Sequence, residues 1–591
     1  NGVESEARVW VAGVRQGCPL APLLYLFMGQ ALASWLRSKT QLGVLLGGRR
    51  SVSGHYADDT KAFLSDCHPA TVAVLTDALQ RFADASGQLT HLGKSRALFA
   101  GSGPAAPCPA ALAGDIPVVQ HVDILGASAA AAPPPLPTPL PPAHDTRASH
   151  TLPITGPVQV PAHAEQAFAA RLLKALAATR RLSALPVSDM GRAVLMSAYG
   201  LSKLLHSAAW SGLPAGAADA ARDIARAILP GVPVQLCGGR PRDGGFGLLP
   251  LLEHTAARRV ALAVRYAQQF VGEGVLSPAA HALATVMRRA CPALHPAQTL
   301  LLAAHTSQAA AACGVLTAPD VQQQRFAPGL LTDVMAALQR MGPLGMRADG
   351  GANPGSSGQA LAFLTRPSVT NAEAAEGVGR LQWERTGAKP LGLLDGVSVR
   401  QATAHLTASH TAARARRHQE FVQLALRPAG LPSGQQRSAA TSSLHKGMLT
   451  AWRGPCPNRG LSVLWRAAIN CLPGGRCNPW RCPCGAPAAA PATAREHTLW
   501  DCPVAQAVAS QMDGALGAAS PAPLARADVW LLRPPSAAVE PAVWAPVCAM
   551  ALDAMEHGRA VLWARLAGGA GTAVAQDTAV LAGGGPAAPG A

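Results

Sequence analysis

Two adjacent carboxylates, Asp58 and Asp59, are the first residues whose types and spacing suggest chemistry. They follow Tyr56 and Ala57 and lie between two apolar stretches. Hard divalent cations such as Mg²⁺ bind carboxylate oxygens and keep several waters. In nucleotidyl transfer, two such cations about 3.5–4 Å apart activate the attacking oxygen and stabilise the leaving one. The pair could supply part of a two-metal site, although an isolated Asp-Asp pair is more often a solvated turn.

The surrounding pattern predicts the elements that hold this pair. Prolines followed by apolar residues at helical spacing predict a helix over residues 19–39. Short strands are expected at residues 44–46 and 52–56, with a return strand at 61–64. This order places the two carboxylates at an exposed hairpin tip. A second helix is expected over residues 71–85, where a Ser-Gly pair ends it.

Three cysteines and a histidine further along the chain offer a different chemistry. Cys482, Cys484, His497 and Cys502 combine thiol and imidazole groups, which suit tetrahedral Zn²⁺. The His-x4-Cys spacing fits one helical turn plus a residue. The first two cysteines are closer together than in the usual Cys-x-x-Cys, so Cys477 is an alternative to either of them. The competing interpretation is a set of free, buried cysteines.

Composition favours a polyanionic partner. Lys and Arg outnumber Asp and Glu by 50 to 33, which leaves a net charge of +17. A general skew toward Arg and Ala is the alternative explanation. Arg414, Arg416 and Arg417 could meet a phosphate backbone or simply form a solvated helix face. The 13 cysteines are scattered, which favours a reducing compartment, and no uninterrupted apolar run predicts a membrane span.

A longer motif precedes the carboxylate pair, Gly13-Val14-Arg15-Gln16-Gly17-Cys18-Pro19-Leu20-Ala21-Pro22. This motif and Tyr56-Ala57-Asp58-Asp59 together resemble the reverse transcriptases of non-LTR (LINE-type) retrotransposons. In that family, Gln-Gly-Xaa-Pro-Leu-Ser-Pro opens the helix that lines the template and nucleotide pocket. Tyr-Ala-Asp-Asp forms the catalytic hairpin of the polymerase palm. Alanine stands here in place of the family's usual serine.

The resemblance continues along the chain. Lys94-Ser95 resembles the family's Lys-Ser, and His91 stands where asparagine is usual. Residues 190–205 and 244–248 resemble its thumb-like helices and its Gly-Gly-Leu-Gly-Leu turn. Residues 496–503 resemble Glu-x-x-His-Leu-Phe-x-x-Cys-Pro, the signature of a zinc-binding module thought to hold nucleic acid. The match is good over 1–126, where Leu125-Gly126 resembles the primer-grip Leu-Gly, and fair over 165–270.

The resemblance implies an RNA-directed DNA polymerase that acts on an RNA template, a DNA primer or target and dNTPs. It implies a nuclear location or a cytoplasmic ribonucleoprotein. Catalysis would use Mg²⁺ or Mn²⁺ on Asp58 and Asp59. The implied nucleotide- and template-binding residues are Gln16, Gly17, Pro19, Tyr56, Ala57 and Lys94. The implied Zn²⁺ ligands are Cys482, Cys484, His497 and Cys502.

One catalytic group of the family has no counterpart among the residues that carry the resemblance. Its first catalytic aspartate lies before the Gln-Gly motif, yet the first aspartate here is Asp58. Only Glu4 and Glu6 precede it as acids, in a stretch expected to form a hairpin. We therefore expect a fragment of a longer polymerase that is inactive alone. The alternative is a non-catalytic remnant that binds nucleic acid through its phosphates.

The expected fold class is α+β: a partial polymerase palm of antiparallel strands and helices, a helical thumb and connector, and a small zinc-binding module. Six segments are expected along the chain. They are a partial palm (1–126), an Ala/Pro-rich linker (127–163), a thumb-like helical region (164–270), an Ala-rich helical connector (271–440), a zinc-binding module (441–510), and a C-terminal helical segment with a disordered tail (511–591).

Overall fold

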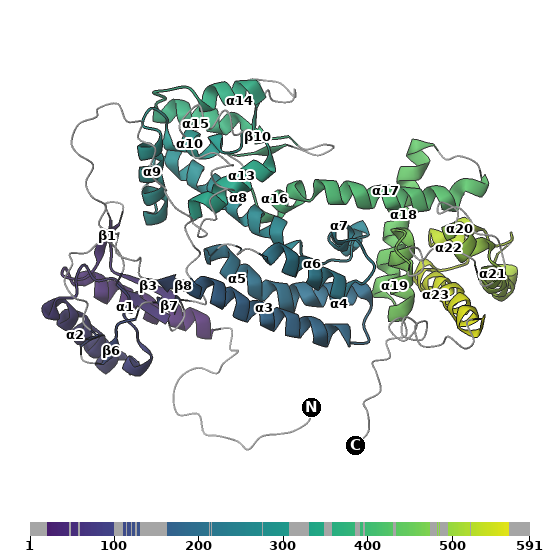
Figure 1. The fold of residues 1–591 in the computed structure, drawn as a ribbon, viewed down its shortest axis with the longest axis horizontal. Coiled ribbons are helices and arrows are strands. Elements are labelled where there is room, and N and C mark those ends of the chain that lie inside the picture. The colour runs from purple at the N-terminus through teal and green to yellow at the C-terminus, as the bar shows by residue number, and fades with distance from the viewer. Residues whose placement is uncertain are drawn as a thin grey trace, which may run out of the picture. The chain divides into compact units, whose positions relative to one another are not determined.

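The chain is seen in a computed structural model that describes residues 20–46, 49–56, 59–99, 110–113, 115–119, 121–124, 127–130, 162–211, 213, 216–274, 276–305, 330–347, 357–384, 390–393, 396–429, 433–472, 482, 484, 494–520 and 522–566. These residues are mostly helical, with a few small antiparallel sheets (Figure 1). Two compact units form. Unit 1 comprises residues 1–164, 263–327 and 344–382, and unit 2 comprises 165–262, 328–343 and 383–591.

The first part of unit 1 is built on two helices and a hairpin. Helix α1 (Ala21–Ser38) begins with a proline in its first turn, and α2 (Pro69–Ser86) ends at Gly87, whose φ of 72° is left-handed. Both predicted helices are thus confirmed. Their shared core consists of Leu36, Leu42, Val52 and Ala78. Trp35 Nε1 also donates to the Ala78 carbonyl at 2.9 Å, which ties α1 to α2.

Antiparallel strands β3 (Ser53–Tyr56) and β4 (Asp59–Ala62) form the expected hairpin. Their register pairs Ser53 with Ala62 and Tyr56 with Asp59, so the chain reverses between the last two. The nearby strands β1 (Val44–Leu46) and β2 (Arg49–Ser51) form a second antiparallel pair. The 1–12 hairpin and the Leu125-Gly126 pair lie outside the described residues.

The remaining elements of unit 1 are short strands and helices. Gln298 is fully buried in α10, and its Nε2 donates to the carbonyls of Phe363 at 2.6 Å and Arg366 at 3.1 Å. The buried amide group is therefore hydrogen-bonded, as buried polar groups in folded proteins usually are. The bounds are η1 (Leu92–Lys94), β5 (Ala111–Leu112), β6 (Ile116–Pro117), β7 (His121–Ile124), β8 (Ala127–Ala130), α9 (Pro278–Ala290), α10 (Pro296–Leu302), β9 (Gly345–Met346), α14 (Ser357–Leu364), α15 (Asn371–Arg380) and β10 (Leu381–Trp383).

Unit 2 is a helical assembly around one large core. Phe246, Phe421, Trp465 and Trp530 are among its fully buried side chains. Its elements are α3 (Ala162–Ser183), α4 (Asp189–Leu195), η2 (Met196–Leu201), α5 (Ser202–Ser211), α6 (Ala217–Ile228), α7 (Val234–Cys237), η3 (Pro241–Asp243), α8 (Leu251–Val271, which continues into unit 1), α13 (Leu330–Met341), β11 (Leu391–Gly392), α16 (Val399–Leu406), α17 (Ala408–Leu426), η4 (Arg427–Ala429), α18 (Gly434–Arg453), α19 (Asn458–Ala468), α20 (Ala494–Glu496), η5 (His497–Asp501), α21 (Pro503–Leu516), η6 (Gly517–Ala519), α22 (Arg526–Trp530) and α23 (Pro541–Leu566).

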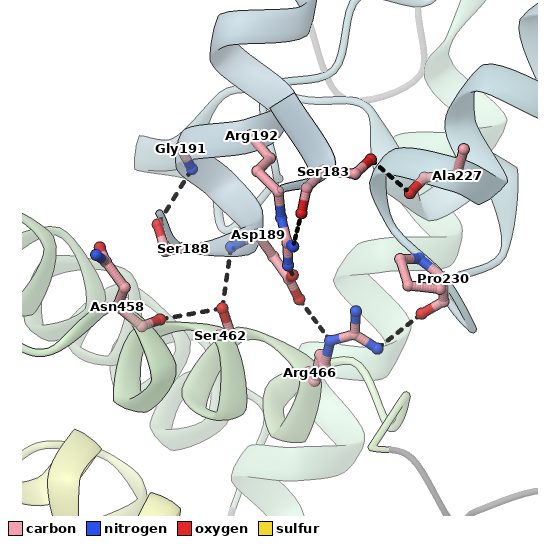
Figure 2. Close-up of polar contacts among 10 residues, drawn as sticks. All are labelled: Ser183, Ser188, Asp189, Gly191, Arg192, Ala227, Pro230, Asn458, Ser462 and Arg466. Atoms are coloured by element: carbon pink, nitrogen blue, oxygen red, sulfur yellow. Dashed lines mark hydrogen bonds and ion pairs between the residues drawn. The ribbon is translucent and has the colours of Figure 1, made fainter. Parts of the chain in front are cut away.

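A buried ionic network joins α4 to α19 inside unit 2. The Asp189 carboxylate accepts from Arg466 Nε at 2.5 Å and from Arg192 Nη2 (Figure 2). Arg466 also donates to the Pro230 carbonyl at 2.8 Å, and the Ser462 hydroxyl accepts from the Asp189 backbone at 2.9 Å. Because both ends of the main pair are buried, removing one would leave an uncompensated charge in the core.

A glycine-rich turn at residues 238–247 accepts hydrogen bonds from side chains of helices that are distant in the sequence. Arg414 Nη1 donates to the Gly238 carbonyl at 3.0 Å, and Trp465 Nε1 donates to the Gly245 carbonyl at 3.1 Å. His418 lies so close to Gly244 that a Cβ there would sit 2.1 Å from its ring. Arg414 is therefore buried, and the prediction that it shares an exposed basic face was wrong. Arg416 and Arg417 are exposed.

The expected linker at 127–163 begins inside a strand, since β8 spans its first four residues, and α3 begins near its end. The rest of that segment and the tail after Leu566 lie outside the described residues. The separate folding of the six segments stays a prediction. Of the described helices, none has both the length and the apolar character needed to cross a lipid bilayer.

Candidate metal centre

Cys482, Cys484, His497 and Cys502 converge in unit 2. Each offers one ligand atom, and these four atoms lie within 4.8 Å of one another. His497 opens the π-helical turn η5, and Cys502 is the N-cap of α21. The Cys502 N–H donates to the His497 carbonyl at 2.8 Å, so the two ligands belong to one closed turn. The alternative ligand Cys477 lies outside the described residues.

Two contacts between ligand atoms are close to the edge length of a tetrahedral zinc site. The sulfurs of Cys482 and Cys502 are 3.6 Å apart, and Cys484 Sγ is 3.3 Å from His497 Nε2. A tetrahedron with metal–sulfur bonds of about 2.3 Å has edges of about 3.8 Å. A disulfide would need about 2.05 Å between the sulfurs. The donor set and its spacing are compatible with Zn²⁺.

Burial makes the Cys482 thiol a poor anion unless a cation is present. It raises the pKa of Cys482 to about 12, and the side-chain hydrogen bonds with Cys484 and Cys502 contribute to that increase. Ligating thiols must lose their protons, and a bound cation supplies the compensating charge. Metal binding at this cluster would therefore release protons.

The predicted polymerase residues are only partly described. Asp59 is exposed at the start of β4, opposite Tyr56, as the hairpin-tip prediction requires. Lys94 is exposed at the end of η1. Gln16, Gly17, Pro19, Ala57 and Asp58 lie outside the described residues, and so does the Tyr56 side chain. The Mg²⁺ site implied by the resemblance therefore stays a prediction.

Sequence reasoning missed the charged residues that support the cluster. Arg495 and Glu496 directly precede His497, and both are buried. Arg and Glu are almost never fully buried unless paired, so nothing in their local sequence predicts this environment. The only available signal was that Glu496 opens the stretch 496–503, which resembles the zinc-module signature, and that Arg495 directly precedes it.

Comparison with known protein families gives no assignment, since no family model matches the chain. The resemblance to non-LTR reverse transcriptases therefore rests on the motifs alone.

Proposed function

We propose that this chain is part of an RNA-directed DNA polymerase of the non-LTR retrotransposon type. A Zn²⁺ ion on Cys482, Cys484, His497 and Cys502 would stabilise its C-terminal region, which binds nucleic acid. The observation that carries the proposal is the convergence of these four ligand atoms within 4.8 Å. The same four residues are the ligands that the family resemblance implies.

The proposed zinc role is structural. Four protein ligands complete a tetrahedral shell and leave no open position for substrate or water, which is typical of structural zinc sites. The ligands come from two stretches, 482–484 and 497–502, so a bound ion would cross-link them. The free energy of metal binding then adds to the stability of unit 2.

The proposed polymerase role rests on the motif resemblance and is supported by the β3–β4 hairpin, in which Asp59 begins β4 opposite Tyr56. In the complete enzyme, Asp58 and Asp59 would bind Mg²⁺ or Mn²⁺ with a further carboxylate. Gln16, Gly17, Pro19, Tyr56, Ala57 and Lys94 would face template and nucleotide. RNA template, DNA primer and dNTPs would be its partners, in the nucleus or in a cytoplasmic ribonucleoprotein.

A non-catalytic nucleic-acid-binding remnant is the second candidate. One observation favours it: the net charge of +17, which suits binding to phosphates whether or not catalysis occurs. Primer extension on an RNA template with Mg²⁺ distinguishes the two activities. We expect no extension by this chain alone. Synthesis that Asp58→Asn abolishes would show instead that the chain is a working polymerase.

Nucleic-acid binding is tested by its salt dependence. Lys174 and Arg181 are exposed on α3, seven residues apart and so on one helical face. Replacing both with Gln should weaken binding to RNA or single-stranded DNA. It should also reduce the slope of log K against log salt by roughly 1–2, because each lost phosphate contact contributes about 0.7–0.9.

The matched control is Arg222→Gln with Arg226→Gln on α6. These two guanidinium groups pair with Asp219 and Asp223 on the same helix, so their charge is locally compensated. Replacing these two arginines should change the slope of log K against log salt less than replacing Lys174 and Arg181 does. Binding by the wild-type chain that does not depend on salt would contradict phosphate recognition.

A further inference from the structure

The ligand-bearing segment 494–502 is held by side chains that are not metal ligands. Arg495 and Glu496 come directly before His497, and the side chains of both are almost completely buried. Leu499 follows two residues later and is fully buried. Buried charges persist only when they are paired and hydrogen-bonded, so the partners of these two residues fix the position of the segment.

Glu496 pairs with arginines from two other elements. Its Oε1 lies 2.9 Å from Arg526 Nη1 on α22, and its Oε2 lies 3.3 Å from Arg427 Nη1 on η4. Arg526 is itself buried, lies over the Trp530 ring at 5.3 Å and donates to the Leu424 carbonyl. The carboxylate therefore connects the residue before His497 to α22 and to the end of α17.

Arg495 and Trp530 hold the segment at two further points. Arg495 Nη1 donates to the Ala467 carbonyl at 3.1 Å. Trp530 Nε1 donates to the Leu499 carbonyl at 3.1 Å, and its ring stacks on Phe421 with centroids 4.9 Å apart. The backbone is thus fixed on both sides of His497 by contacts that need no metal.

We propose that Glu496 is a positioning residue of the metal centre. With Arg526 and Arg427 it holds His497 and Cys502 in their binding arrangement, while Cys482 and Cys484 come from a separate stretch. Ligands that are already in place lose little conformational freedom when the metal binds, so their support raises affinity. The inference rests on the proposed metal centre, since it assigns a role in that site.

The test compares metal affinity in full-length variants. Glu496→Gln keeps the size of the side chain and removes the charge that both arginines need. Affinity is measured with Co²⁺, a coloured substitute for Zn²⁺, and then with Zn²⁺ against a chromophoric chelator. Residues that orient metal ligands typically change affinity by about 10–100-fold, and we expect a loss of at least about tenfold. Unfolding of both proteins in excess chelator measures stability without metal.

The matched control is Glu556→Gln, which removes another buried carboxylate of unit 2, paired with Arg559 within α23. It should destabilise the metal-free protein and leave metal affinity unchanged. If Glu496→Gln binds metal as tightly as wild type, the positioning role is wrong and the metal centre stands. If wild type and His497→Ala with Cys502→Ala bind equally little metal, the metal centre itself is wrong.

A second variant covers the case in which Glu496→Gln does not fold. Arg427 is 62% exposed, so Arg427→Met removes one partner of Glu496 without emptying the core. Because the Arg427 side chain is mostly exposed to solvent, this ion pair contributes less than the buried one, and we expect a loss of affinity of about two- to fivefold. Unchanged affinity in this variant would overturn the proposal.

Discussion

Buried His418 lies next to Gly244 and pairs with His445, which is half-buried. His418 Nδ1 lies 2.8 Å from His445 Nε2, and the rings meet edge to face. Burial, and to a lesser extent positive charge on His445, Arg414 and Arg495, together lower the pKa of His418 to about 3. Burial also lowers the pKa of His445. Both shifts favour the neutral form of the ring in the folded protein.

This pair predicts acid sensitivity of unit 2. Because the pKa of His418 in the folded protein lies below its unfolded value of 6.5, the unfolded state binds the proton first. The stabilising effect of this histidine is complete above pH 6.5 and is lost progressively toward pH 3. Between pH 7.5 and 5.5, wild type should lose about 1.4 kcal/mol more stability than His418→Leu. Denaturant unfolding at both pH values measures the difference.

The two proteins share the same metal ligands, so any acid-induced release of metal cancels in that comparison. Equal pH dependence in wild type and His418→Leu would contradict the buried neutral pair.

Asp189 offers a second test at the level of one residue. Asp189→Asn leaves buried Arg466 without its counter-charge, and breaking such a pair costs about 3–5 kcal/mol. Asp219→Asn removes an exposed pair with Arg222 and should cost less than about 1 kcal/mol. Equilibrium unfolding measures the free energy of unfolding of both variants. If the two variants lose similar amounts of stability, the network shown in Figure 2 is not a buried ionic link.

At the level of elements, the β3–β4 hairpin depends on the core beneath it. An isolated two-stranded hairpin is marginally stable in water, and here Leu36, Leu42 and Val52 supply the packing. Leu36→Ala should cost about 2–5 kcal/mol of local stability and speed amide hydrogen exchange in β3 and β4. Leu26→Ala, at a side chain 65% exposed on the same helix, is the control. Similar exchange in both variants would contradict this dependence.

Elements with strong local signals could be predicted from the sequence. The proline in the first turn of α1, the apolar period of α2 and Gly87 at its end all act within a few residues, and the structure follows them. The four residues of the candidate metal centre were also singled out from residue type and short spacing, with Cys477 left as an alternative.

Long-range contacts could not be predicted in this way. Arg414 looked like part of a basic surface, but its guanidinium binds the Gly238 carbonyl of a turn 176 residues away. Asp189 and Arg466 are 277 residues apart. Only the folded arrangement of helices brings such groups together. The residues next to them in the sequence do not predict these contacts.

At the level of the whole molecule, unit 2 combines residues from three separate stretches of the chain. Its core includes Phe168 and Met190 from the region that resembles a polymerase thumb, together with Trp465 and Leu499 near the metal ligands. Helices α19 and α23, both labelled in Figure 1, contact each other within this unit. A metal bound at the four ligands would therefore stabilise a unit that extends well beyond residues 482–502.

The most direct test of the account is the zinc content of the purified chain. Wild type should hold one Zn²⁺ per chain by elemental analysis, and His497→Ala with Cys502→Ala should hold close to none. Cys456→Ala with His557→Ala removes one thiol and one imidazole from outside the cluster, and it should keep the metal. Equal zinc in wild type and the His497 and Cys502 double variant would contradict the metal centre.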